Sequence, residues 1–255
     1  MGIIKNEIPI LEFDTEQGAV INPTYEKLNL NLPKKCVFAF LGDYIEEYAS
    51  KTDTKQVSSY ISATKKYPVY ITKYKGEEIV LCQAPVGAAA AVQILDWLIG
   101  YGVREIISAG SCGSLEHFDE GTFLIPGKAL RDEGTSYHYA PPSRFIEISE
   151  RARKAIEKTI LEHHMKYQEV ITWSTDGFYR ETKEKVEYRK KEGCAVVEME
   201  CSALAACAAF RNATFGMILY TADSLVDVDK YDERHWGGNA YEYALILCLD
   251  AVLAL

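Results

Sequence analysis

Short apolar runs alternate with longer segments of helical periodicity over most of the chain. Runs rich in β-branched and apolar residues predict strands at residues 36–41, 69–73, 79–83, 105–109, 123–126, 169–172, 195–199 and 215–221. Helical spacing predicts helices at about 88–99, 144–163, 181–192, 201–210 and from 240 onward. This alternation indicates crossover connections, and therefore an α/β fold with a largely parallel or mixed central sheet covered on both faces.

The first 34 residues differ from the rest of the chain. They are polar and rich in turn-forming residues, including prolines at 9, 23 and 33. No fixed-period repeat, low-complexity segment or Gly/Ser linker divides the remaining sequence. The sequence therefore predicts an arm or edge segment over residues 1–34 and a single domain over residues 35–255.

Composition narrows the class of protein. With 255 residues, 48% of them hydrophobic, the chain can form a sizeable core, and its net charge of -9 argues against a nucleic-acid partner. The seven cysteines form no C-x-x-C pair and are interpreted as reduced core thiols. The N-terminus lacks a signal-peptide pattern, and no apolar run approaches the ~20 residues of a membrane span. We expect a cytoplasmic protein that binds a small molecule, without a metal or a membrane partner.

Ligands of α/β folds bind at the carboxyl ends of the strands, so the turns after the predicted strands are candidate sites. One of these is the segment Ala109-Gly110-Ser111-Cys112-Gly113-Ser114. Its glycines either let backbone N–H groups converge on an anion or relieve a tight turn with positive φ. Taken alone, the segment favours the conformational role.

Two carboxylates interrupt an apolar run in VVEMECSAL, residues 196–204. A buried carboxylate is costly unless it is paired or hydrogen-bonded. If strand geometry persists, Glu198 and Glu200 lie on one face and Met199 on the other, and the two acids suit the paired hydroxyls of a ribose. The alternative is a helix N-terminus, whose dipole favours an acid and explains Glu200 but not Glu198.

Two further segments contain candidate residues. The strand predicted to end at residue 221 is followed by Asp223, which is a general acid if burial raises its pKa, or else an N-cap, the role that spacing alone favours. The segment STDGFY at 174–179 places Phe178 either in ordinary packing or as a stacking surface for a planar ligand.

Read together, these segments resemble the nucleoside phosphorylase superfamily, which includes purine nucleoside phosphorylase, uridine phosphorylase and methylthioadenosine nucleosidase. GSCG at 110–113 looks like the phosphate-side glycine turn, VEMECSAL is similar to the V-E-M-E-x-x-x-[IL] ribose motif, and STDGFY and RDEGTSYHYAPP (131–142) resemble segments of uridine phosphorylase. The resemblance implies a single domain with a central mixed, partly barrel-like sheet flanked by helices. It also implies a homo-oligomer, either a dimer or a trimer of dimers.

The resemblance further implies roles for particular residues. Glu200 would hold the ribose 2′- and 3′-hydroxyls, Met199 would pack beneath the sugar, Glu198 would support the site, Phe178 would stack on the base, and Asp223 would protonate a purine at N7. Gly110 and Ser111 would contact substrate, and Gly42, Ser111 and Lys65 would bind phosphate. Cleavage of an N-glycosidic bond makes the ribose positive and the base negative, so the site needs a sugar clamp, a proton donor and a nucleophile.

The chain departs from the family pattern at the nucleophile. Where phosphorylases carry G-D-P-x-R, this chain has Glu46 in place of the arginine, Ser108 replaces a second arginine, and Lys65 falls near a third that a neighbouring subunit lends. Each lost charge-assisted contact is worth ~1.5–3 kcal/mol, although Lys65, Lys66 or Arg131 could compensate. The hydrolytic nucleosidase has a run of glutamates here, one of which activates water, and Glu46 or Glu47 could do the same.

Three functions follow, in order of preference. The first is phosphorolysis of a nucleoside to base and ribose 1-phosphate, with inorganic phosphate as co-substrate and no cofactor, because Gly42, Ser111 and residues 131–138 resemble phosphorylases. The second is hydrolysis by a Glu-activated water, with Glu47 as the candidate base. The third is a non-catalytic nucleoside-binding protein of the same fold. Asp223 favours a purine over uridine.

Overall fold

The computed structural model describes residues 2–255, and in this range ten strands and six α-helices form. The strands are β1 Lys35–Ala39, β2 Thr54–Ile61, β3 Lys66–Tyr74, β4 Glu77–Gln83, β5 Glu105–Ser114, β6 Phe123–Asp132, β7 Phe145–Glu147, β8 Gln168–Thr175, β9 Cys194–Glu198 and β10 Thr214–Ser224. The α-helices are α1 Tyr44–Lys51, α2 Ala88–Gly100, α3 Glu150–Glu162, α4 Lys183–Lys191, α5 Cys201–Phe210 and α6 Tyr241–Leu253. Short 3₁₀ turns are η1 Pro9–Leu11, η2 Thr135–His138, η3 Phe178–Arg180 and η4 Gly238–Ala240.

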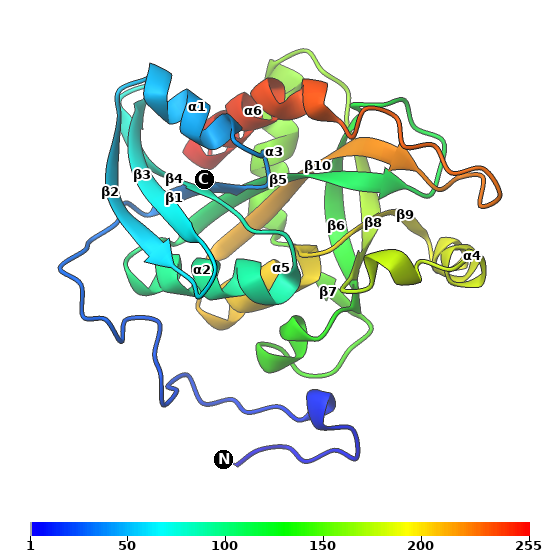
Figure 1. Ribbon diagram of the computed structural model, residues 1–255, viewed down its shortest axis with the longest axis horizontal. Coiled ribbons are helices and arrows are strands. Elements are labelled where there is room, and N and C mark those ends of the chain that lie inside the picture. The colour runs from blue at the N-terminus through cyan, green and yellow to red at the C-terminus, as the bar shows by residue number, and fades with distance from the viewer. Residues whose placement is uncertain (1) are drawn as a thin grey trace.

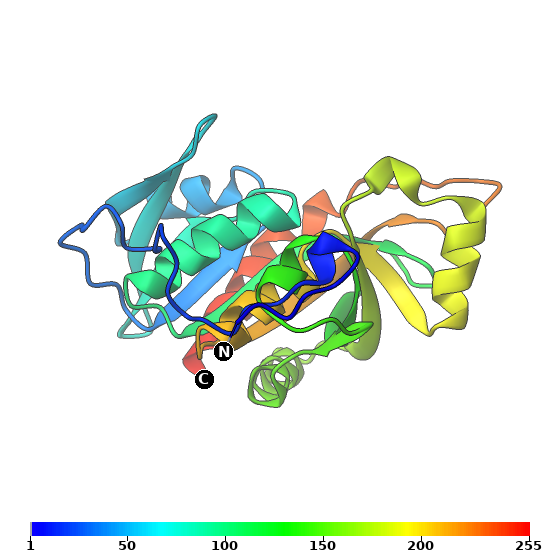
Figure 2. The ribbon, with the colours of Figure 1, turned by 90° about the horizontal axis from the view of Figure 1, so that it is seen from below.

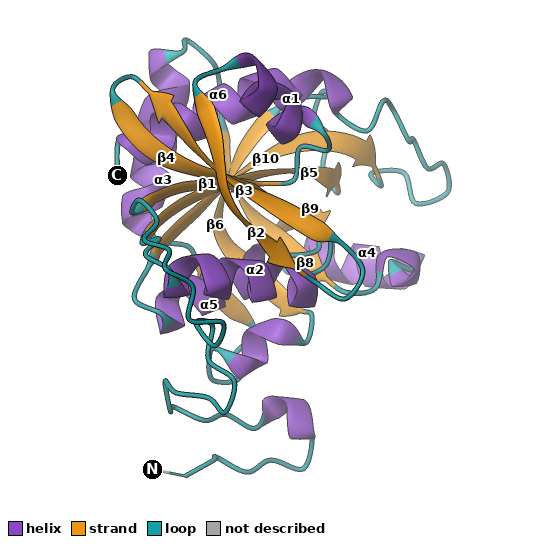
Figure 3. Ribbon diagram, turned by 60° about the vertical axis from the view of Figure 1, so that its left-hand side comes forward, coloured by secondary structure: helices purple, strands orange, loops and turns teal. Residues whose placement is uncertain are grey.

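A single mixed sheet runs through the molecule (Figures 1 and 3). Five strands close into a barrel in the order β10-β6-β8-β9-β5, because β5 pairs back to β10 in parallel. Outside the barrel, β1, β4, β3 and β2 continue the sheet from β5, and β7 pairs with β6. The expected α/β fold with a mixed, partly barrel-like sheet is confirmed.

The helices cover both sides of this sheet (Figure 1). Helices α1, α3 and α6 lie on one side, and α2 and α5 pack together on the other. The segment AAAAVQILDWLIG forms α2 because alanine and straight-chain residues favour helix, and most of its side chains are buried in the core. All seven cysteines are buried and free.

Several elements differ from the sequence prediction. Helix α1 and strand β2 were not predicted, because α1 has only eight residues and β2 is polar and mostly half-exposed, so neither shows a strong period. The helix expected at 144–163 is divided into β7 and α3, because Ser149 caps α3 by accepting a hydrogen bond from the backbone N–H of Ala152.

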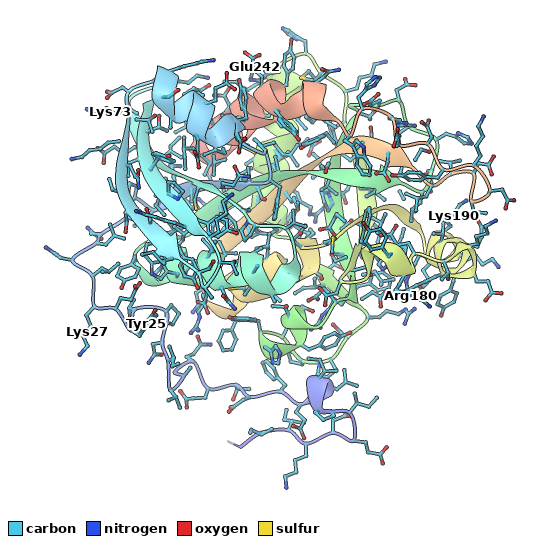
Figure 4. The ribbon with its side chains drawn as sticks, viewed as in Figure 1. Tyr25, Lys27, Lys73, Arg180, Lys190 and Glu242 are labelled. Carbon is cyan, nitrogen blue, oxygen red and sulfur yellow. The ribbon has the colours of Figure 1, made fainter. Side chains whose placement is uncertain are left out.

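Residues 2–34 form an arm that crosses the body on the side of α2 and α5 (Figures 1 and 2). The indole Nε1 of Trp97 donates to Glu26 at 3.1 Å, and the backbone N–H of Leu32 donates to the carbonyl of Tyr101 at 2.8 Å. Tyr25 and Lys27 lie at the outer edge of the arm (Figure 4). Among the described residues, no helix combines the length and apolarity needed to cross a membrane.

Candidate active site

A cavity of about 470 Å³ lies toward the carboxyl ends of β5, β9 and β10. It is lined by Phe40, Val86, Gly110, Ser111, Cys112, Gly113, Phe178, Glu181, Val197, Glu198, Met199, Glu200, Met217, Asp223 and Trp236. Seven residues that the sequence singled out are thus brought together, namely Gly110, Ser111, Phe178, Glu198, Met199, Glu200 and Asp223. Barrel closure places them around one space although they are far apart in sequence.

The segment around Gly110 and Gly113 is a strand and not a turn. It forms the second half of β5, and neither glycine has a positive φ, so the predictions of an anion-binding nest or a tight turn are wrong here. The glycines instead leave room for neighbouring side chains. A Cβ on Gly113 would lie 2.8 Å from Leu225 Cδ1, and one on Gly110 would lie 3.3 Å from Phe40 Cδ2. Between them, the exposed Ser111 lines the cavity.

Glu198 ends β9 and holds the start of α5. Its carboxylate accepts hydrogen bonds from the Ser174 hydroxyl at 2.5 Å and the Thr172 hydroxyl at 3.2 Å. It also accepts from the backbone N–H groups of Glu200 at 2.7 Å and Cys201 at 2.6 Å. The prediction that strand geometry continues to Glu200 is therefore wrong, and the alternative of a helix start is correct. Glu198 satisfies the first N–H groups of the helix and is itself fully hydrogen-bonded.

Glu200 is 5% exposed and lies at the N-cap position of α5. Its Oε1 accepts a hydrogen bond of 2.6 Å from the backbone N–H of Gly87, which precedes α2. Burial, and then the charge of Glu198, raise the pKa of Glu200. A carboxylate has about four lone-pair sites, so Glu200 retains acceptor capacity toward the cavity.

Asp223 lies near the end of β10 and is 7% exposed. Its Oδ2 accepts a hydrogen bond of 3.0 Å from the Tyr231 hydroxyl, which reaches it from the loop after β10. Burial raises the pKa of Asp223. No helix starts directly after Asp223, so the N-cap interpretation is wrong, and the environment is that of a candidate general acid.

Sequence reasoning missed five lining residues, Phe40, Val86, Glu181, Met217 and Trp236. Glu181 directly follows η3 and is only three residues from Phe178 in the sequence, so the sequence could have identified it as a candidate lining residue. Trp236 has no such signal, because it comes from the long loop before η4 and is 48% exposed. Burial, and then the charge of Asp223, raise the pKa of Glu181 to about 7.

Three predicted residues lie outside the lining of the cavity. Gly42, with a φ of 54°, precedes α1 beside the ring of Tyr241. Glu47 lies on the exposed face of α1 in an ion pair with Lys51. Lys65 is exposed in the β2–β3 connection.

Arg131, one of the cations that could have compensated for the missing arginines, is 5% exposed. Its guanidinium donates to the hydroxyls of Ser136 and Ser143 and to the carbonyl oxygens of Ala140 and Pro141. It holds the loop after β6 and does not line the cavity.

The lining of the cavity is acidic. It contains four carboxylates, those of Glu181, Glu198, Glu200 and Asp223, and no Lys, Arg or His. Within residues 2–255, no group of three or more His, Cys, Asp or Glu side chains is placed to hold a metal ion. The arrangement therefore offers hydrogen-bond acceptors and an acid, beside the aromatic surfaces of Phe178 and Trp236.

Residues 34–254 match the sequence model of the family described as the Phosphorylase superfamily. The chain belongs to this superfamily. It is 25% identical over 209 residues to a guanosine phosphorylase of Halorubrum lacusprofundi, covering 78% of this chain and 85% of that protein. It is 30% identical over 151 residues to a 5′-methylthioadenosine/S-adenosylhomocysteine nucleosidase of Buchnera aphidicola, covering 54% of this chain and 64% of that protein.

The fold is shared with solved members of the superfamily. The purine nucleoside phosphorylase of Toxoplasma gondii, solved in complex with immucillin-H, superposes with a TM-score of 0.76 at 19% identity, covering 88% of this chain and 91% of that chain. The family expected from the motifs is confirmed. Because the Phosphorylase superfamily relatives include both phosphorylases and nucleosidases, membership identifies the class of enzyme and leaves the reaction and the substrate open.

Proposed function

We propose that this chain cleaves the N-glycosidic bond of a purine nucleoside. The observation that carries the proposal is the meeting, in one cavity, of the buried acceptor Glu200, the buried acid Asp223 and the aromatic surface of Phe178. Glu200 accepts hydrogen bonds from the ribose hydroxyls, Met199 packs beneath the sugar, and Phe178 stacks on the base.

The charges that develop during cleavage match this arrangement. As the bond breaks, the ribose becomes positive, and this charge favours the ionised form of the Glu200 carboxyl, whose pKa is raised by burial and by Glu198. The resulting carboxylate stabilises the ribose in a site largely shielded from water. The base becomes negative, and Asp223 transfers a proton to N7, so the base leaves neutral. The Tyr231 hydroxyl orients the Asp223 carboxyl before transfer and stabilises the carboxylate afterwards.

The charge of the cavity favours water over phosphate as the nucleophile. Four carboxyl groups line the cavity, and no lining side chain is a cation. A phosphate dianion would therefore find no charge-assisted donor side chain there, each worth ~1.5–3 kcal/mol, and any ionised acid of the lining would repel it. A neutral water molecule avoids this repulsion. It forms a bond to C1′ of the ribose as the glycosidic bond breaks, and the proton that it gives up replaces the one that Asp223 transfers to N7.

Phosphorolysis is the second candidate, and the similarity to a guanosine phosphorylase favours it. Phosphate bound near Ser111 would then need cations from outside the cavity. Lys65 on its exposed connection could supply one to a second copy of the chain, in a dimer or a trimer of dimers. For either reaction we expect the protein to act in the cytoplasm.

The test measures products with and without phosphate. Adenosine, inosine, guanosine and uridine are incubated with the protein, and free base, ribose and ribose 1-phosphate are quantified. We expect base and free ribose from a purine nucleoside at a rate independent of phosphate. Ribose 1-phosphate that rises with phosphate concentration would support phosphorolysis instead.

Two controls separate catalysis from binding. Glu200→Ala is expected to abolish turnover, whereas the matched surface change Glu187→Ala, on the exposed side of α4, is expected to leave it unchanged. If no nucleoside is turned over but adenosine binds in calorimetry, the chain is a nucleoside-binding protein and the enzymatic proposal fails.

A further inference from the structure

Glu181 is a carboxylate without a protein partner inside the candidate active site. It follows η3, is half-buried and lines the cavity. No hydrogen bond or ion pair from residues 2–255 reaches its side chain, and only burial and more distant charges act on it. A half-buried carboxylate without a donor is costly, so a donor on a bound ligand would stabilise it.

Glu181 and Asp223 line the same cavity, and the Tyr231 side chain lies near both. Tyr231 donates its hydroxyl to Asp223 at 3.0 Å and also lines, together with Glu181, a smaller cavity of about 140 Å³. Tyr231 thus lies between the surroundings of the two carboxyl groups.

Two lysines of the helix that follows Glu181 have other partners. Lys185 Nζ lies 2.6 Å from Asp132 Oδ2, and Lys183 pairs with Asp229. The acceptor in the cavity is thus left free for a ligand.

We propose that Glu181 recognises the 6-amino group of a purine and thereby selects adenosine-type nucleosides over 6-oxopurine nucleosides. The inference rests on the proposed function, in which Asp223 donates to N7. On a purine, the substituent at C6 is adjacent to N7, so a carboxylate beside Asp223 faces that substituent. An amino group donates to the carboxylate, whereas the oxygen of inosine or guanosine would face it as a second acceptor.

The first experiment compares kcat/KM for adenosine and inosine. The wild type is expected to prefer adenosine by at least about tenfold, the usual worth of a hydrogen bond to a charged group. Glu181→Gln carries both a donor and an acceptor, so the preference should fall toward unity. Glu187→Gln, the same change on the exposed face of α4, should keep the wild-type preference.

A second measurement needs no variant. The free base purine carries hydrogen where adenine carries the amino group, and neither base has a glycosidic bond to cleave. We expect the wild type to bind adenine at least about tenfold more tightly than purine in calorimetry. Equal affinities would overturn the inference even if Glu181→Gln failed to fold.

The pH dependence of the preference is a third readout. Burial and Asp223 raise the pKa of Glu181 to about 7, while Lys185 opposes the shift. Tyr231, Lys183 and Asp227 line the adjoining small cavity. Above about pH 7 the ionised Glu181 accepts from the amino group, and below it the protonated form can donate to a 6-oxo group. The adenosine-to-inosine ratio should therefore rise from about pH 6 to about pH 8, and the titration of Asp223 largely cancels in that ratio.

The outcomes separate this inference from the function on which it rests. If no nucleoside is cleaved, the proposed function fails, and the inference fails with it. If nucleosides are cleaved but the wild type prefers inosine, or Glu181→Gln keeps the preference for adenosine, only the inference is overturned. A ratio that stays flat with pH in the wild type contradicts it as well.

Discussion

Four carboxylates line the cavity, and each has different partners. Glu198 accepts four hydrogen bonds from its surroundings, Glu200 accepts from a backbone N–H, Asp223 accepts from a phenol, and Glu181 has no donor within the described chain. Glu198 is thus a structural cap, whereas the proposed function and the inference drawn from it assign the other three to sugar binding, proton donation and recognition of the base. Hydrogen bonding and burial decide which protonation state of each is favoured.

Replacing Asp223 tests the proton-transfer step at the scale of one residue. Asp223→Asn keeps the shape but cannot protonate N7, so kcat/KM for adenosine should fall by about 10²–10⁴-fold. Uridine has no N7 and should lose much less of its residual rate. The control Asp227→Asn alters an exposed acid of the same loop. Equal losses for the two nucleosides in Asp223→Asn would refute the assigned role.

Glu200 makes stability depend on pH. Its pKa is raised in the folded state by burial and by Glu198, so the folded protein binds more protons than the unfolded chain. Stability from this group is therefore greatest below its unfolded pKa of about 4.5 and is lost as pH rises through the folded pKa. Urea unfolding from about pH 5 to about pH 9 should show a falling free energy of unfolding. In Glu200→Gln the free energy of unfolding should fall less steeply with pH. An unchanged pH dependence would argue against a raised pKa of Glu200.

At the scale of elements, one glycine sets the distance between α3 and the sheet. A Cβ on Gly216 in β10 would lie 2.7 Å from the Cβ of Ala152 and 3.0 Å from Cδ1 of Ile156. Both neighbours belong to α3, whose backbone would have to move to make room.

Gly216→Ala is therefore expected to destabilise the protein by about 1–3 kcal/mol through overpacking. Gly238→Ala is the matched control, because a Cβ there meets nothing within 4 Å. Thermal unfolding of both variants measures the difference, which should appear as a lower Tm for Gly216→Ala alone. Equal Tm values would mean that α3 adjusts without cost.

Periodicity predicted the long and buried elements and failed on the short or polar ones. Helix α5 was predicted with its observed bounds, because all but its last two residues are buried. Helix α1 and strand β2 were not predicted, because their positions depend on packing against neighbours more than on a local pattern. The glycines of β5 suggested a turn, whereas the structure places them in a strand, close to the side chains of Phe40 and Leu225.

At the scale of the molecule, closure of the barrel builds the cavity and gives it a strongly acidic lining. The whole chain carries a net charge of -9, so the field around the cavity opposes anionic ligands. A 5′-phosphate on the nucleoside would bring a dianion toward a lining that has four carboxyl groups and no cationic side chain.

We therefore expect AMP to be a poorer substrate than adenosine. At low ionic strength, kcat/KM for adenosine should exceed kcat/KM for AMP by at least about tenfold. This difference should decrease as salt screens the repulsion. Release of adenine from both compounds at two salt concentrations is the measurement. Cleavage of AMP at the rate of adenosine would mean that cations outside the lining neutralise the site.

The sequence by itself determined the family, the α/β class and the identities of seven lining residues, because the motifs around 110, 178, 198 and 223 are local in the chain. Only the tertiary structure decided how each acid is partnered, that Glu47 and Lys65 lie outside the cavity, and that Glu181 and Trp236 lie inside it. The physical reason is that burial and hydrogen bonding depend on contacts between distant segments. A motif identifies the side chain, but the burial and hydrogen bonds that set its protonation state are formed only when the barrel closes.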